Sequence, residues 1–142
     1  MRPAREESGQ SVIEVLVLGL ALLMPLIWLL SVLAEVHAAA LATTAAVRDA
    51  GLSAARSTGM QQARSAADRA VAAALSHQGL DPALANAHIS LPPAMRRGGT
   101  VSVEIAYPVT VGRFPLLGSM GGPSVWVRAR HLARIDPYRS DP

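Results

Sequence analysis

The stretch Gly9-Gln10-Ser11-Val12-Ile13-Glu14 leads directly into the apolar run that decides the fold. From Val15 to Ala34 the chain reads VLVLGLALLMPLIWLLSVLA, twenty residues without one ionisable side chain. A helix of this length is about 30 Å long, which is the thickness of the hydrocarbon core of a bilayer. The run is longer than the roughly 7–15-residue apolar region of a secretory signal peptide. The sequence therefore predicts one transmembrane helix near the amino terminus.

Glu14 is the unusual residue of this stretch, because it follows Val12 and Ile13 inside the apolar block. A carboxylate in a membrane helix costs about 2.5–3.5 kcal/mol near the centre and less toward the interface, so it is expected to have a function and a partner. Simpler interpretations remain open. Ser11 and Glu14 have the spacing of a helix-capping box, a carboxylate in the first turn suits the helix dipole, and the side chain could reach interfacial water.

Gly9, followed five residues later by Glu14 at the start of an apolar helix, resembles the prepilin peptidase site of type IV pilin-like proteins. Within that group, the hexapeptide resembles that of TadE-like minor pseudopilins of tight-adherence (Tad/Flp) pilus systems. The resemblance implies cleavage after Gly9, with Gln10 as the new amino terminus. It also implies that Glu14 of one subunit neutralises the α-amino group of a neighbour. Val15 departs from the pattern, because many pilin-like sequences of this class have an aromatic residue there.

The same resemblance implies a set of partners and a location. The partners are the prepilin peptidase, other pilin-like subunits, an inner-membrane pilus platform with its assembly ATPase, and membrane lipid. Arg2 and Arg5 precede the apolar run, and the next arginine is Arg48, so the bias of basic residues predicts a cytoplasmic amino terminus and an extracytoplasmic remainder. The predicted location is the cell membrane, with incorporation into a pilus as a further expectation.

Length and composition limit the other classes of function. The 142 residues leave room for one membrane helix and one small domain. All thirteen basic residues are arginine, and the net charge of +3 is spread over the chain, so no nucleic-acid partner is predicted. The chain has no cysteine, which excludes disulfides, cysteine-bound zinc and thiol catalysis.

No pattern of catalytic or metal-binding residues is found in the sequence. The four histidines stand singly rather than at metal-ligand spacing: His37, His77, His88 and His131. The run Gly118-Ser119-Met120-Gly121-Gly122 does not match the nucleophile elbow, and a phosphate-binding loop would need a lysine. The expectation is a chain without catalytic residues, cofactor or metal, which is a substrate of processing rather than an enzyme.

The predicted fold is an α+β membrane protein, in which a long transmembrane helix extends into a small domain with a second helix packed on a three-stranded antiparallel sheet. Residues 1–9 would form a leader, 10–57 the helix and its extracytoplasmic extension, and 58–142 the domain. Pro25 is expected to kink the first helix and Gly51 to weaken it. A capping box at Thr58 and Gln61 is expected to start the second helix, and Gly79 to end it.

The second helix is expected over 59–78, because small apolar residues recur there at helical spacing: Ala63, Ala67, Ala70, Val71 and Ala74. Alternation of apolar and polar residues predicts strands at about 87–91, 100–111 and 125–135. Arg128, Arg130 and Arg134 are expected on the face of the third strand opposite its apolar residues. The order of these elements, with the pattern Val-x-Val-x-Ile-x-Tyr-Pro from Val101 to Pro108, again resembles the TadE-like family.

The loop before the third strand contains several large apolar residues, among them Phe114, Leu116 and Leu117. They could fold over the small core or form an exposed contact with a partner. Two other functions remain open for the whole chain. It could be a bitopic envelope protein with a small ligand- or wall-binding domain, or a secreted protein cut near Ala40, where Ala38-Ala39-Ala40 is similar to a signal-peptidase site.

Overall fold

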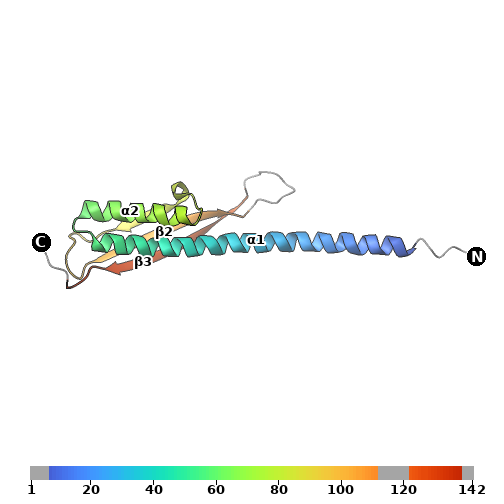
Figure 1. The fold of residues 1–142 in the computed structure, drawn as a ribbon, viewed down its shortest axis with the longest axis horizontal. Helices are drawn as coiled ribbons and strands as arrows, with labels where there is room; N and C mark the ends of the chain where they lie inside the picture. Colours follow the sequence, from blue (N-terminus) through green and yellow to red (C-terminus); the bar gives the residue numbers. More distant parts are fainter. Residues whose placement is uncertain (1–6, 112–121, 139–142) are drawn as a thin grey trace, which may run out of the picture. The chain divides into compact units, whose positions relative to one another are not determined.

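The computed structural model describes residues 7–111 and 122–138 and has the expected α+β architecture. Two helices are followed by a short 3₁₀ turn and three strands (Figure 1): α1 Glu7–Arg56, α2 Met60–His77, η1 Pro82–Leu84, β1 Asn86–Ser90, β2 Thr100–Thr110 and β3 Ser124–Arg134. The chain forms two compact units, Met1–Ala34 and Glu35–Pro142. The first part of α1 belongs to the first unit, and the rest of α1 belongs to the second.

The start of α1 differs from the prediction. The helix begins at Glu7, three residues before Gln10, so Ser11 and Glu14 lie beyond its first turn and are not placed as a capping box. α1 runs as one α-helix through Pro25, although proline has no N–H to donate to the carbonyl of Ala21. The kink expected at Pro25 stays a prediction.

Helix α2 confirms the predicted apolar face but not the predicted cap. Gly59 is the N-cap and makes no side-chain hydrogen bond, and the Thr58 hydroxyl instead contacts Gln62 Oε1 at 2.8 Å. The capping box at Thr58 and Gln61 is therefore wrong. The buried face follows i, i+4, i+8 spacing as expected and adds one residue that the prediction missed, Leu75: Ala63, Ala67, Val71 and Leu75.

Gly79 ends α2 as predicted. Its φ of 72° lies in the left-handed region that glycine adopts without a steric cost. The N–H of Gly79 donates to the carbonyl of Ser76 at 3.0 Å, and the N–H of Leu80 donates to that of Leu75 at 3.0 Å. This pair of bonds is a Schellman motif, which satisfies carbonyls that the end of the helix leaves without partners.

The sheet has the order β1-β2-β3, and both pairs are antiparallel. All three strands lie within one residue of their predicted bounds. β1 covers only the segment of β2 from Ser102 to Ala106, so the later part of β2 has a free edge among the described strands. The N–H of Val111 donates to the carbonyl of Pro123, which lies next to β3. Backbone nitrogens alternate in direction along a strand, so the nitrogen of Pro108 points the other way, toward the free edge of β2. Proline is tolerated there because no hydrogen bond of the sheet is lost.

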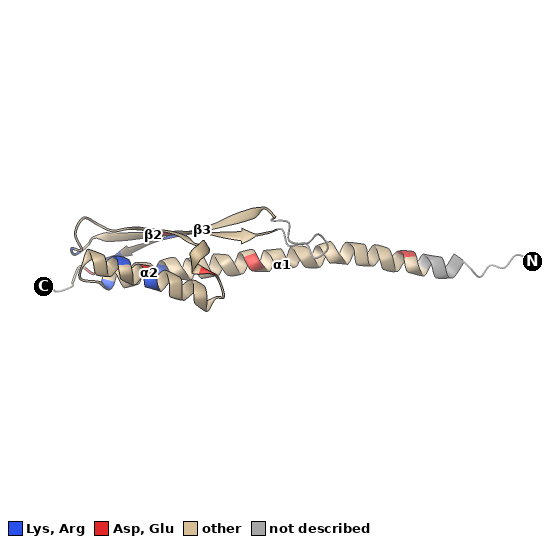
Figure 2. Ribbon diagram, turned by 90° about the horizontal axis from the view of Figure 1, so that it is seen from above, with Lys and Arg blue, Asp and Glu red and all other residues tan. Residues whose placement is uncertain are grey.

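The core lies between one face of the sheet and the two helices, which lie on the same side of it (Figure 2). β2 contributes the most regular part, with its alternate side chains buried: Val101, Val103, Ile105, Tyr107 and Val109. From α1 the core receives mostly alanine at spacings of three and four residues: Ala39, Ala42, Ala46, Ala50 and Ala54. Thr43 is also fully buried, and its hydroxyl lies 2.9 Å from the carbonyl of Ala39, so its polar group is satisfied.

Gly51 lies where α1 comes close to β3. A Cβ atom added there would lie 3.0 Å from Cδ2 of His131 and 3.2 Å from Cβ of Ala133, both on β3. The glycine expected only to weaken the helix therefore also has a packing role, since a larger residue would force His131 and Ala133 to shift.

We predict that Gly51→Val lowers the free energy of unfolding by about 1–3 kcal/mol, because the added methyl groups overpack the contact with β3. The matched control is Ala45→Val, which places valine on an exposed position of the same helix and costs only a few tenths of a kcal/mol in helix propensity. Urea unfolding of the full chain in detergent would measure both. Adding His131→Ala to Gly51→Val should recover part of the loss, and equal losses for Gly51→Val and Ala45→Val would contradict the packing argument.

Tyr107 connects the sheet to the turn after α2. Its side chain is 5% exposed, and its hydroxyl accepts a hydrogen bond from the N–H of Asp81 at 3.2 Å. The side-chain carboxylate of Asp81 in turn accepts a hydrogen bond from the N–H of Ala83 at 2.9 Å and so caps the start of η1.

Tyr107→Phe is expected to lower the free energy of unfolding by about 0.5–1.5 kcal/mol, because it removes the acceptor of a partly buried N–H. Tyr138→Phe serves as the control, since the Tyr138 side chain is 91% exposed. Thermal unfolding followed by near-UV circular dichroism would compare the two. A loss for Tyr138→Phe as large as for Tyr107→Phe would refute this role of the hydroxyl.

Candidate functional site

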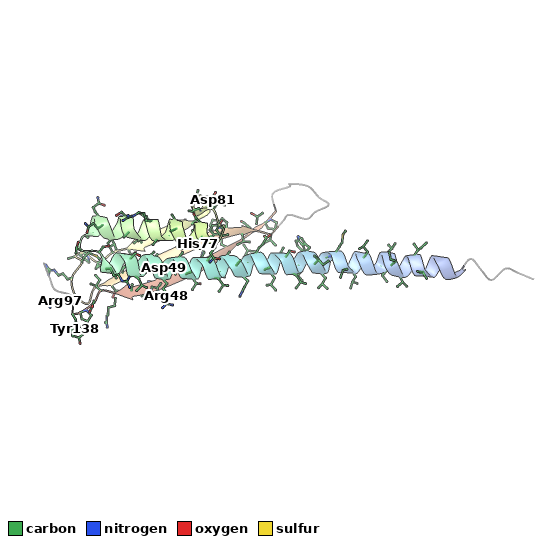
Figure 3. All side chains as sticks on the ribbon, in the orientation of Figure 1. Arg48, Asp49, His77, Asp81, Arg97 and Tyr138 are labelled. Carbon is green, nitrogen blue, oxygen red and sulfur yellow. The ribbon has the colours of Figure 1, made fainter. Side chains whose placement is uncertain are left out.

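From Val12 to Ala34 the first unit is the apolar part of α1, and its side chains are exposed around most of the helix (Figure 3). Leu22 is 71% exposed and Val15 is 70% exposed, and between Val12 and Ala34 only Trp28 and Val32 are half-buried. Because water does not stabilise such a surface, this part of α1 requires an apolar environment. α1 is long and apolar enough over Val12–Arg56 to be a candidate membrane span, with a mean hydropathy of 2.6 in its most apolar window.

Glu14 is the one ionisable residue of α1 between Val12 and Ala34, and its side chain is exposed. It lies about one and a half turns after Gly9, which the structure places with Gln10 in the first turn of the helix. Gly9, Gln10 and Glu14 are therefore close in space because one short helical segment carries them. Phe114, Leu116 and Leu117, the predicted loop contact, lie outside the described residues.

The second unit has a hollow of about 650 Å³ between α1 and α2 on the side away from the sheet. Alanines from both helices form much of its lining, and the ionisable residues that line it are Asp49, Arg56 and His77, of which Figure 3 labels Asp49 and His77. Among residues 7–111 and 122–138, no group of three histidine, aspartate or glutamate side chains could hold a metal ion. The hollow presents no set of groups with an evident catalytic arrangement.

The face of the sheet opposite the helices carries a cluster of arginines that sequence reasoning placed together but gave no role. Arg128, Arg130 and Arg134 alternate along β3, and all three are exposed. Trp126 and Leu132 on the same face are 52% and 58% exposed. We call this face of the sheet, together with the residues of β1 and β2 that share it, the basic sheet face. The alternation in β3 predicted the shared face, but the sequence did not predict which residues of the other strands lie beside it.

The pairing of β3 with β2, and of β2 with β1, shows which residues lie beside the arginines on this face. Arg128 pairs with Ala106, and Arg130 pairs with Glu104, which itself pairs with His88 on β1. The Nε–H of Arg130 donates to Oγ of Ser102 at 3.3 Å. The short Ala106 side chain leaves a hollow of about 320 Å³, whose other lining residues are all polar: Asn86, His88, Glu104 and Arg128.

Comparisons of the chain with protein-family models, with curated proteins and with solved structures found no match. Two surfaces of the chain are candidates for a function: the apolar part of α1 with Glu14, and the basic sheet face.

If the apolar part of α1 crosses a bilayer, a cysteine at position 22 will be shielded from water-soluble reagents. The chain contains no cysteine, so a single introduced thiol is a clean reporter. We predict that, in native membranes, Leu22→Cys reacts with a hydrophilic maleimide at least about tenfold more slowly than Ser76→Cys on the exposed face of α2. Both thiols should react equally after solubilisation in SDS. Equal rates in native membranes would exclude the span.

Proposed function

We propose that the chain is a pilin-like membrane subunit, a minor pseudopilin of a Tad/Flp-type pilus that is processed after Gly9. The observation that carries the proposal is the isolated carboxylate of Glu14 in an exposed apolar helix, five residues after Gly9. In this proposal the amino terminus is cytoplasmic and the Glu35–Pro142 unit is extracytoplasmic. The chain is a substrate of the prepilin peptidase rather than an enzyme.

A carboxylate at this position needs compensation from a positive charge. An ion in an apolar bundle is tolerable when it is paired and hydrogen-bonded, and it is costly when it is alone. Among residues 12–34 of α1 no basic side chain is present, so the helix cannot supply the partner itself. Cleavage between Gly9 and Gln10 would create an α-amino group at the start of each helix, and Glu14 of a neighbouring subunit could pair with it.

The position of the Gly9–Gln10 bond suits a peptidase. Backbone N–H groups in the first turn of a helix lack full intrahelical pairing, and helix ends open at little free-energy cost. Gly9 has no side chain to block the approach of an enzyme to the backbone. The bond lies in the first turn of α1, so local unwinding there would leave the rest of the helix intact.

The unit Glu35–Pro142 would then be the part that a pilus or its base presents outside the membrane. Its partners in the proposal are other pilin-like subunits, with the inner-membrane platform and assembly ATPase acting on the anchored chain. A bitopic envelope protein with a ligand- or wall-binding domain is the second candidate, and the polar hollow of the basic sheet face favours it.

Secretion after cleavage near Ala40 is disfavoured by packing. Ala39 is 1% exposed and belongs to the core, and the Thr43 hydroxyl contacts the carbonyls of Ala39 and Ala40. Removing residues up to Ala40 would delete a core side chain and leave Thr43 with neither acceptor.

The test is the amino-terminal residue of the protein recovered from native membranes. We predict a start at Gln10 for the unaltered chain and at Met1 for Gly9→Ala, because the added methyl group hinders the approach of the peptidase to the bond. Intact-mass spectrometry distinguishes the two. A start at Met1 in the unaltered chain would leave a simple anchor, and a start near Ala40 would indicate a secreted protein.

Glu14→Gln is the matched variant for the assembly role, because it keeps the shape of the side chain and removes the charge. It should be cleaved normally, and it should co-purify with other pilin-like subunits at least about fivefold less, since the α-amino group loses its counter-charge. Glu35→Gln, on the same helix but outside the apolar run, should change neither property. Normal co-purification of Glu14→Gln would remove the assembly role of this carboxylate.

A further inference from the structure

The basic sheet face carries more positive than negative groups within a small area. Among its described residues the ionisable side chains are three arginines, one histidine and one glutamate: Arg128, Arg130, Arg134, His88 and Glu104. Side chains two residues apart on a strand lie about 7 Å from one another, so Arg128 and Arg130 are neighbours along β3, while Leu132 separates Arg130 from Arg134. An anionic occupant is therefore favoured, and a second copy of the same face is disfavoured by like charge.

An exposed aromatic ring lies at the end of this row. Trp126 is two residues before Arg128 on the same face of β3, and it pairs in register with Pro108. A large aromatic side chain that remains 52% exposed offers a flat apolar surface to a ring-shaped ligand. Such a surface fits the C–H face of a sugar ring.

The hollow beside Arg128 adds neutral and acidic hydrogen-bonding groups. The amide of Asn86 and the imidazole of His88 come from β1, and the carboxylate of Glu104 comes from β2. These groups can exchange hydrogen bonds with hydroxyls, while the planar guanidinium of Arg128 can bind a carboxylate through two parallel N–H donors. The hollow thus combines a carboxylate-binding group with groups that bind hydroxyls.

We propose that the basic sheet face binds an acidic polysaccharide, with Arg128 holding the carboxylate of a uronic acid unit and Trp126 stacking on an adjacent sugar ring. Arg130 and Arg134 extend the contact along β3 to further acidic units. The site lies within the Glu35–Pro142 unit, so the proposal goes beyond pilus assembly and does not rest on it.

Two other anionic partners fit less well. Single-stranded nucleic acid is bound by several aromatic side chains that stack successive bases, whereas Trp126 is the one aromatic residue on the described part of this face. The carboxylate of Glu104 would repel any anion, the carboxylates of a polyuronate included. The hydroxyls of each sugar unit can donate hydrogen bonds to it, however, which the phosphates of a nucleic-acid strand or of an anionic bilayer cannot do.

The experiment measures binding of the full chain in zwitterionic detergent to sodium alginate, a polyuronate, with neutral dextran as the reference. We expect alginate binding that Arg128→Gln weakens about tenfold, because it removes a charge-assisted pair of hydrogen bonds. Arg64→Gln removes the same charge from the exposed side of α2 and should change affinity less than about twofold. In a Trp28→Phe background, alginate should shift the fluorescence of Trp126, the remaining tryptophan.

The alginate affinity of Glu104→Ala distinguishes binding at a defined site from non-specific electrostatic attraction. If Glu104 binds a hydroxyl, its loss weakens alginate binding; if attraction is only electrostatic, removing a negative charge strengthens it. Equal losses for Arg128→Gln and Arg64→Gln, stronger binding of Glu104→Ala, or binding of dextran as tight as that of alginate would each overturn the proposal. Tighter binding of single-stranded DNA or of vesicles containing phosphatidylglycerol would overturn it in favour of those partners. Unchanged thermal unfolding of each variant confirms that the fold is retained.

Discussion

The folded unit depends on the close approach of α1 to the sheet, and that approach depends on small side chains. Gly51 contacts His131 and Ala133 so tightly that a single added carbon would crowd both. Dispersion attraction falls steeply when a gap of even 0.5–1 Å opens, so small side chains stabilise this interface only if the backbones stay near one another. Larger buried residues are few and lie mainly on β2 and α2, including Ile105, Val103 and Leu75. A shift of α1 away from the sheet would therefore weaken the packing of all these small side chains at once.

The same helix has two kinds of surface along its length, and the composition changes where its surroundings change. From Val12 to Ala34 it is rich in leucine, and its side chains are exposed on nearly all sides. From Ala39 onward alanine dominates, and burial recurs every three or four residues on one face. Large apolar residues all round suit lipid or neighbouring helices, while small residues on one face suit contact with a sheet.

Much of this fold could be predicted from the sequence because strand alternation is a strong pattern. In β2 every second residue from Val101 is buried, and the strand bounds follow directly from that alternation. The helix starts were predicted less well. Thr58 has the residue type and spacing of a cap, yet its hydroxyl contacts Gln62 and Gly59 takes the N-cap position. Capping depends on local backbone geometry, which residue types at a given spacing do not determine.

The roles of Gly51 and of the arginines on β3 depend on contacts between distant segments. From the sequence alone, a glycine within a helix predicts only a lower helix stability, and its packing role appears once the strand beside it is known. Likewise Arg128 lies beside Ala106, Asn86 and His88 only because the register of three strands brings them together. No local pattern in the chain contains that register, so the hollow in the basic sheet face could not be predicted from sequence.

The two candidate surfaces place different demands on a partner. Glu14 lies in an apolar helix, where one unpaired charge is costly and one correctly placed cation is decisive. The arginines on β3 lie in water, where salt screens each charge and one ion pair contributes less than it does in an apolar environment. A surface of the second kind becomes effective when many copies bind one long ligand, because linked contacts raise the local concentration of the next one. An assembly that orders subunits through Glu14 would supply those copies, so the apolar helix and the basic sheet face would act at different steps of attachment to a surface.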